Sequence, residues 1–167
     1  MIAAAHPSLL LAATFALAAI LAAISIADFR RQIIPDGLNL ALAAVGLGYQ
    51  VAAAGADGLP LHLLFAAATF AAAWLLRRGH FLMTGRIGLG LGDVKMLAAA
   101  ACWIDPLLLP VLLFIASATA LLFVGGQVVA SGPAAARARI AFGPFITIGL
   151  GSCWVLEQFA GLNMGLL

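Results

Sequence analysis

Charged residues are scarce in this chain. Of its 167 residues only 8% are Asp, Glu, Lys or Arg, whereas 65% are apolar and the mean hydropathy is +1.18. A soluble domain carries about a quarter charged residues. The deficit extends over the whole length, and no polar linker or charge block divides the chain. We therefore expect a single polytopic membrane domain over residues 1–167, with lipid as its solvent.

Cysteine and histidine are also rare, and their spacing argues against the common metal centres. Cys102 and Cys153 are lone residues in apolar segments, so we expect small packing residues rather than a CxxC zinc site or a disulfide framework. The three histidines lie in separate segments and form no HExxH cluster. We expect neither a metal nor another cofactor. The net charge of +2 is too small to indicate a nucleic-acid partner.

Apolar runs predict an all-α bundle of about six transmembrane helices, since one crossing takes about 20 residues. The predicted helices cover residues 8–27, 38–54, 59–76, 94–104, 107–130 and 142–159. The fourth would rise only about 16 Å at 1.5 Å per residue. It therefore either starts before the glycines at positions 88, 90 and 92 or begins at some depth inside the bilayer.

Basic residues are absent from every second loop, which predicts the orientation. The eight Lys and Arg residues are Arg30, Arg31, Arg77, Arg78, Arg86, Lys95, Arg137 and Arg139. All of them fall at one set of alternating helix ends, and the positive-inside rule places that set in the cytoplasm. A cleaved signal peptide would require Lys or Arg before its apolar core, and neither precedes the first apolar run here. We expect a retained anchor with the N-terminus outside.

Acidic residues number only six, and at membrane depth such groups are candidates for function. Asp57 and Asp105 lie in short outer loops where a turn role suffices, and we expect Glu157 to be solvated near the outer end of the last helix. Asp28 ends the first predicted helix at the cytoplasmic face. Asp93 follows a glycine-rich stretch at the cytoplasmic start of the fourth. Two carboxyls from distant segments are thus expected at one membrane level.

Such a pair can hydrolyse a peptide bond. Two carboxyls in one site cannot both ionise cheaply, so one retains its proton to higher pH. The ionised member can deprotonate a water while the protonated member hydrogen-bonds the scissile carbonyl. Structural alternatives stay open. Asp93 can be a helix N-terminal residue favoured by the helix dipole, and Asp28 can be an interfacial charge that pairs with Arg30 or Arg31.

The glycines Gly88, Gly90 and Gly92 alternate, which differs from the GxGxxG order of a dinucleotide-binding turn, and no strand precedes them. Glycines permit unusual backbone angles and close helix approach. Backbone exposed at this depth must be buried in protein or line a wet cavity. We expect a flexible, water-accessible approach to Asp93.

Three segments at these positions resemble the type IV prepilin peptidases and archaeal preflagellin peptidases, the GxGD membrane proteases. They are DFRRQIIPD at 28–36, GLGDVK at 90–95 and FGPF at 142–145. The family patterns are an Asp followed a few residues later by Ile/Leu-Pro-Asn/Asp, then GxGDxK, then a Phe-Gly-Pro block that opens the last helix. The resemblance implies an aspartyl endopeptidase of the inner membrane that cleaves prepilin leaders at the cytoplasmic face.

By this resemblance Asp28 and Asp93 are the catalytic aspartates. The supporting residues it implies are Asp36, Lys95, Gly90 and Gly92. Alternatives remain for two of them, because Asp36 can be a turn residue after a proline and Lys95 an interfacial anchor.

One departure from the larger, bifunctional members concerns a cytoplasmic cysteine-paired region near the N-terminus. Those members also methylate the trimmed pilin. This sequence has no CxxC and no room for that region before Asp28, so it resembles the short, peptidase-only form that serves tight-adherence (Flp-type) pili.

The expected partners are the lipid bilayer and a prepilin with a basic leader and an apolar helix. The leader would meet a basic rim with Arg30, Arg31 and Arg86, so we expect side-chain fit and helix docking, rather than charge attraction, to drive recognition.

Two other functions stay open. A proton- or ion-coupled transporter also uses paired acids at the membrane face, but it needs polar side chains that continue across the bilayer. The helices supply few, namely Asn39, Gln50, Thr69, Ser117, Thr119 and Gln127. A non-catalytic subunit of a pilus or secretion assembly is the third hypothesis. The oligomeric state does not follow from the sequence.

Overall fold

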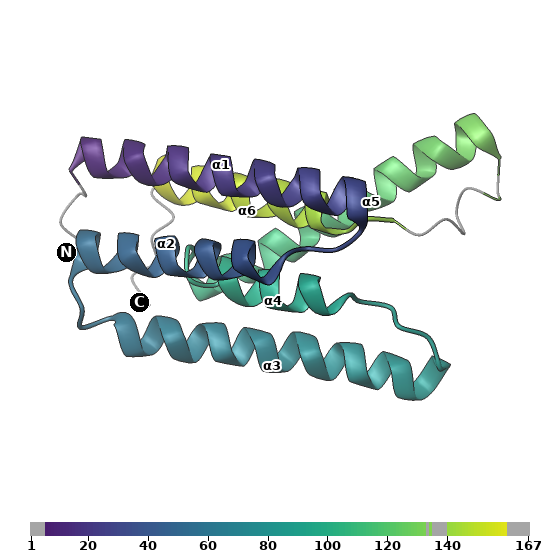
Figure 1. Ribbon diagram of the computed structural model, residues 1–167, viewed down its shortest axis with the longest axis horizontal. Helices are drawn as coiled ribbons and strands as arrows, with labels where there is room; N and C mark the ends of the chain where they lie inside the picture. The colour runs from purple at the N-terminus through teal and green to yellow at the C-terminus, as the bar shows by residue number, and fades with distance from the viewer. Residues whose placement is uncertain (1–5, 133, 135–139, 160–167) are drawn as a thin grey trace.

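The computed structural model describes residues 6–132, 134 and 140–159, and these residues form helices and connections without a strand (Figure 1). The elements are α1 (Pro7–Arg31), α2 (Asp36–Ala54), α3 (Leu59–Thr84), α4 (Leu91–Ala100), the 3-10 helix η1 (Pro106–Leu108), α5 (Leu109–Ser131) and α6 (Gly143–Phe159). The predicted all-α fold is confirmed.

Four helical segments are long and apolar enough to cross a membrane: α1, α2, α3 and the stretch Pro106–Ser131. Large apolar side chains such as Phe15, Phe114 and Leu122 point outward. Outward apolar side chains on helices that satisfy their own backbone are what a lipid solvent requires. The protein is an integral membrane bundle, in which α4 with 10 residues and α6 with 17 residues are the short members.

The predicted limits of two helices were wrong. The third helix was expected to end at position 76, where the apolar run stops, but α3 continues through Arg77 and Arg78 to Thr84. Long basic side chains can extend from a helix toward water, so two arginines do not end it. The fourth helix begins at Leu91, inside the glycine stretch rather than before or after it, and it ends at Ala100.

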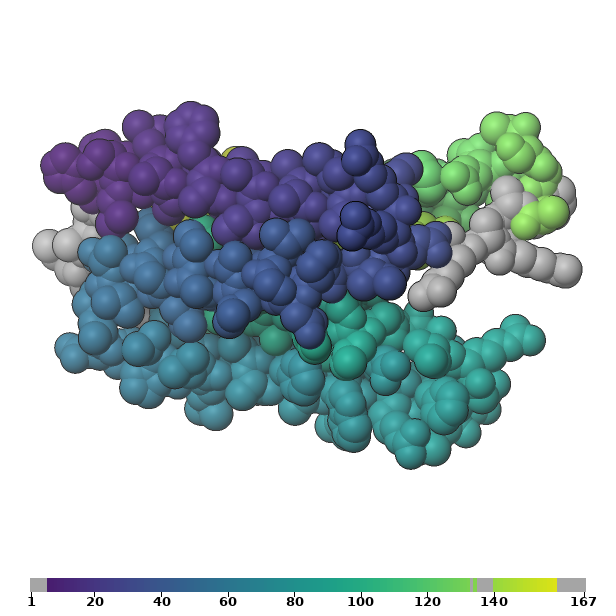
Figure 2. Space-filling model, viewed as in Figure 1, coloured from purple at the N-terminus to yellow at the C-terminus, as the bar shows by residue number. Residues whose placement is uncertain are grey.

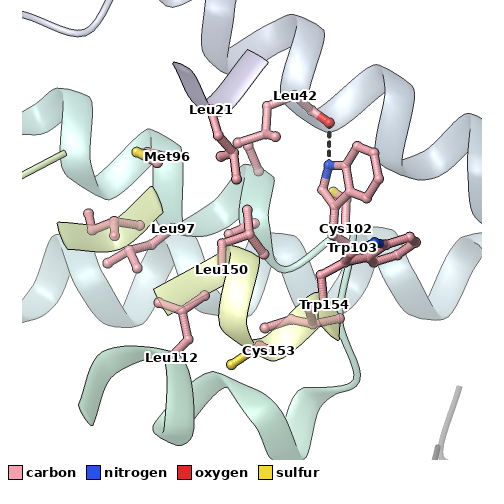
Figure 3. Close-up of a cluster of buried hydrophobic side chains, with 14 of the residues drawn as sticks. Leu21, Leu42, Met96, Leu97, Cys102, Trp103, Leu112, Leu150, Cys153 and Trp154 are labelled. Atoms are coloured by element: carbon pink, nitrogen blue, oxygen red, sulfur yellow. Dashed lines mark hydrogen bonds between the residues drawn. The ribbon is translucent and has the colours of Figure 1, made fainter. Parts of the chain in front are cut away.

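The core lies around α4, which packs against α2, α3 and α6. Its largest buried side chain is Trp103, whose Nε1 donates a hydrogen bond of 2.7 Å to the Leu42 carbonyl (Figure 3). The Trp103 ring also packs edge-on against Trp154 at 5.3 Å. Cys102 and Cys153 are buried in this core, in the packing role that the sequence predicted.

Helix directions alternate, so helix ends that are far apart in the sequence meet at one end of the bundle. The last turn of α1 and the first turns of α2, α4 and α6 lie toward the right of Figure 1. In the space-filling view α1, α2 and α3 extend across the face turned to the viewer (Figure 2). The end where these turns meet carries all three motif segments.

Candidate active site

Asp28 lies in the last turn of α1 and is only 5% exposed. Its Oδ2 accepts a hydrogen bond of 2.8 Å from the backbone N–H of Gly143, the first residue of α6. A Cβ atom at position 143 would lie 2.7 Å from that oxygen, so only glycine permits this approach. The first and third motif segments are therefore in direct contact. Arg30 and Arg31 are exposed, so the buried Asp28 differs from its basic neighbours in environment.

The chain reverses directly after Asp28. Gln32 adopts a left-handed conformation with φ 51°, and its N–H donates a 2.7 Å hydrogen bond to the Asp28 carbonyl. Pro35 then precedes α2 in an extended conformation. Ile34, between them, is buried in the core. This tight reversal holds Asp28 beside the start of α2.

Asp93 is the third residue of α4. Its Oδ2 accepts a 3.2 Å hydrogen bond from the N–H of Gly90, the residue that caps the helix. A Cβ at position 90 would lie 2.7 Å from Oδ2, so a side chain there would displace the carboxyl. The helix N-terminal role left open for Asp93 is thus real. It is compatible with a second role, because a carboxylate offers about four acceptor positions.

Both aspartates line the same two cavities at this end of the bundle. The larger, about 760 Å³, also has Gln32, Gly88 and Phe142 in its wall. The smaller, about 280 Å³, connects the two aspartates with Asp36 and Lys95. The structure therefore brings Asp28 and Asp93 from distant segments to one hollow, as the sequence predicted.

Asp36 and Lys95 form an ion pair between the starts of α2 and α4, with Nζ 2.7 Å from Oδ1. Asp36 is exposed and Lys95 is half-buried. Exposed pairs contribute only about 0–1 kcal/mol to folding. The pair therefore adds little stability, and its notable property is its position on the wall of the aspartate cavity.

The glycine-rich turn before Asp93 is held from two sides by residues to which the sequence analysis gave no role at the site. Asn39 on α2 is 5% exposed and its Nδ2 donates to the Gly92 carbonyl at 3.3 Å. Arg77 on α3 donates from Nε to the Leu89 carbonyl at 3.0 Å. The available signal for Asn39 was its spacing, three residues after Asp36 on the same helical face.

The remaining acids lie at the opposite end of the bundle. Asp57 is exposed in a turn, and Asp105 caps η1 by accepting a 2.9 Å hydrogen bond from the Leu107 N–H, as expected for turn residues. The expectation that Glu157 is solvated was wrong, because it is only 7% exposed. It follows Trp154 by three residues on α6, and Trp154 packs edge-on against Tyr49 at 5.0 Å. That face of α6 is turned inward.

Among the described residues no three His, Cys, Asp or Glu side chains are grouped so as to hold a metal ion. Arg137 and Arg139 lie outside the described residues.

Residues 15–125 match the model of the type IV leader peptidase family. The chain is 34% identical over 144 residues to the prepilin leader peptidase/N-methyltransferase of Neisseria gonorrhoeae. The matched region covers 84% of this chain and 46% of that protein. It is 36% identical over 128 residues to the protein of the same description from Escherichia coli K12, covering 75% and 55%. The chain spans about half the length of the curated relatives it matches. No solved structure matches significantly.

Proposed function

The chain belongs to the type IV leader peptidase family, and from that membership we propose that it is an aspartyl endopeptidase that removes the leader of prepilins. We assign the catalytic pair to Asp28 and Asp93. The observation that carries the assignment is that both carboxyls line the same two cavities, although 64 residues lie between them in the sequence.

In the proposed mechanism one carboxylate takes a proton from a water, which attacks the scissile carbonyl. The other carboxyl, protonated, donates a hydrogen bond to the carbonyl oxygen as negative charge develops there. The Gly143 and Gly90 N–H groups each hold one carboxyl oxygen, which fixes the orientation of the two acids. The water and the peptide segment at the cut would enter the cavity of about 760 Å³ that both acids line. We propose no metal in this reaction, so cleavage should withstand EDTA.

We further propose that this end of the bundle faces the cytoplasm from the inner membrane. Arg30, Arg31 and Lys95 lie near the aspartates, whereas the opposite loops contain Asp57 and Asp105 and no Lys or Arg. This asymmetry supports a cytoplasmic site under the positive-inside rule. Cysteine labelling beside Arg31 and Arg86 from the cytoplasmic side tests the orientation, and labelling of either position only from outside would overturn it.

We propose Flp-type prepilins as the substrates, because the sequence contains no CxxC and in this resembles the short form described above. We do not extend to this chain the methyltransferase activity in the relatives' names, because its two cysteines form no CxxC.

The decisive experiment uses the purified chain in detergent with a purified Flp-type prepilin that retains its leader. We expect a single cleavage between leader and apolar segment, identified by mass spectrometry of both products. A transporter or a non-catalytic assembly subunit would leave the precursor intact, and so would reject the proposal.

A further inference from the structure

A third hollow, about 580 Å³, lies between α2 and α3 with α4 at its floor. These two helices are consecutive in sequence but make little contact with each other, because α4 packs against both. The walls are Leu40, Ala43 and Leu47 of α2 and Leu63, Ala66 and Phe70 of α3. Leu40, Leu63 and Phe70 are exposed, so this apolar groove opens on the outer surface of the bundle.

The shape of the groove suits a helix. Its floor is made of small side chains, Ala98, Ala99 and Cys102. Small residues let a second helix approach closely within a membrane, where contact rather than the hydrophobic effect drives association. From Leu40 to Leu47 the wall is about 10 Å long at 1.5 Å per residue, which is about two turns of a helix.

The groove leads to the aspartates. Asp36 and Lys95 line the groove and also the cavity of about 280 Å³ that contains Asp28 and Asp93. An apolar segment that lies in the groove would therefore reach the catalytic pair with its end. The bond next to that end would be the one presented for cleavage.

One buried group distinguishes a polypeptide from a lipid as the occupant. Asn39 lines the groove and is 5% exposed; its Oδ1 has no hydrogen-bond partner among the described residues. A buried acceptor without a partner costs about 1–3 kcal/mol. A lipid acyl chain has no donor to offer. The first turn of a helix offers N–H groups that have no partner within the helix.

We propose that this groove binds the apolar membrane-spanning segment of the polypeptide substrate, with the start of that segment donating an N–H to Asn39. The inference rests on the proposed function, and it names the surface outside the catalytic pair that selects the substrate. Selection would then depend on an apolar segment directly beside the cut rather than on the charge of the leader.

Alanines on α3 offer a matched test. Ala66 lines the groove, whereas Ala68 is exposed on the same helix and is not part of the wall. We expect Ala66→Trp to lower kcat/KM for the Flp-type prepilin roughly tenfold to a hundredfold, since a misplaced reacting bond can cost about a hundredfold. Ala68→Trp should leave kcat/KM unchanged. Equal rates for both variants would overturn the proposal.

Photo-crosslinking keeps the test informative if Ala66→Trp does not accumulate in the membrane. A benzoylphenylalanine is placed at position 66 or 68 in the inactive Asp93→Asn enzyme, the prepilin is added, and products are identified by mass. We expect prepilin adducts through its apolar segment from position 66 and few from 68. Adducts only with lipid or only with a second copy of the chain would overturn the proposal that the groove binds the substrate. If the wild-type enzyme cuts the prepilin in the same experiment, the proposed function survives that result.

Discussion

At one end of the bundle Asp28, which is buried, and Asp93, which is half-buried, line two cavities. At the other end Asp105 and Glu157 are as buried as Asp28 but line none of the cavities described above. The difference lies in the neighbours. Asp28 and Asp93 accept hydrogen bonds from glycine N–H groups, which leave space beside the carboxyls. Asp105 caps a short helix, and Glu157 follows an aromatic cluster. Burial of an acid therefore does not distinguish the two ends, whereas the cavities beside Asp28 and Asp93 do.

The largest expected effect comes from substitution of the two cavity aspartates, and a normal rate in either variant would remove the proposed difference between the two ends of the bundle. Asp28→Asn and Asp93→Asn should each lower the cleavage rate by about a thousandfold or more, because general acid–base groups contribute about 10²–10⁴ each and the pair acts as a unit. The double variant should be no worse than either single variant. Initial rates with the purified enzyme and prepilin measure this.

Matched controls come from the opposite end. Asp57→Asn and Asp105→Asn should retain near-normal rates, since Asn can replace Asp as a cap. The amount of each variant in the membrane is measured by immunoblot. A stable Asp93→Asn enzyme that still trims the precursor at the normal rate would remove Asp93 from the mechanism.

The next effect tests whether glycine makes the difference. Gly143→Ala should lower the rate roughly a hundredfold, because its Cβ would lie 2.7 Å from the Asp28 oxygen and would displace the carboxyl. Gly48→Ala on α2 is the control, since nothing lies within 4 Å of its added Cβ. In an ordinary helix position alanine is more favourable than glycine by about 1 kcal/mol. Normal cleavage by Gly143→Ala would show that the close approach is dispensable.

A smaller effect should appear in stability alone. Gly46→Ala would place a Cβ 2.6 Å from the indole Nε1 of Trp103, in the packed part of the core. Overpacking of this kind costs about 1–3 kcal/mol. We expect a lower thermal unfolding midpoint than for Gly48→Ala, with a normal rate per folded enzyme at low temperature. A lost rate with an unchanged midpoint would instead link the aromatic cluster to catalysis.

The smallest effect concerns the ion pair on the cavity wall. Asp36→Asn should change the unfolding free energy by no more than about 1 kcal/mol, because exposed pairs are weak. A modest rate loss, less than about tenfold, is expected from the changed charge near the cavity. Comparison of rates at low and high salt separates charge from geometry, since only a charge effect shrinks with salt. A loss as large as that of Asp28→Asn would make Asp36 part of the catalytic group.

The meeting of Asp28 and Asp93 could be predicted because it needs only local information. Hydropathy gives the helices, and the basic residues give the side on which each helix ends. The burial of Glu157 could not be predicted, since it depends on how α6 is rotated against Tyr49. That rotation is set by packing between distant segments.

Contacts between helices could not be predicted either, because they too depend on packing between distant segments. Asn39 and Arg77 hold carbonyls of the glycine-rich turn, but neither shows a partner in its own segment. The full length of α3 also does not follow from hydropathy, because the end of the apolar run at position 76 is not the end of the helix. The helix extends beyond the apolar run to Thr84, and Gly85, which has a positive φ of 67°, caps it.

The left-handed Gln32 has a consequence for how this protein trades stability against function. It is the one residue other than glycine with a positive φ among the described positions. An L-residue in this conformation costs about 1–2 kcal/mol relative to the right-handed form. Glycine would relieve that cost, yet the position holds a glutamine, and Gln32 lines both cavities that contain the aspartates. Marginal stability is a common cost of function. Stabilisation of this protein by a glycine at position 32 would therefore remove a side chain from the wall of both cavities that Asp28 and Asp93 line.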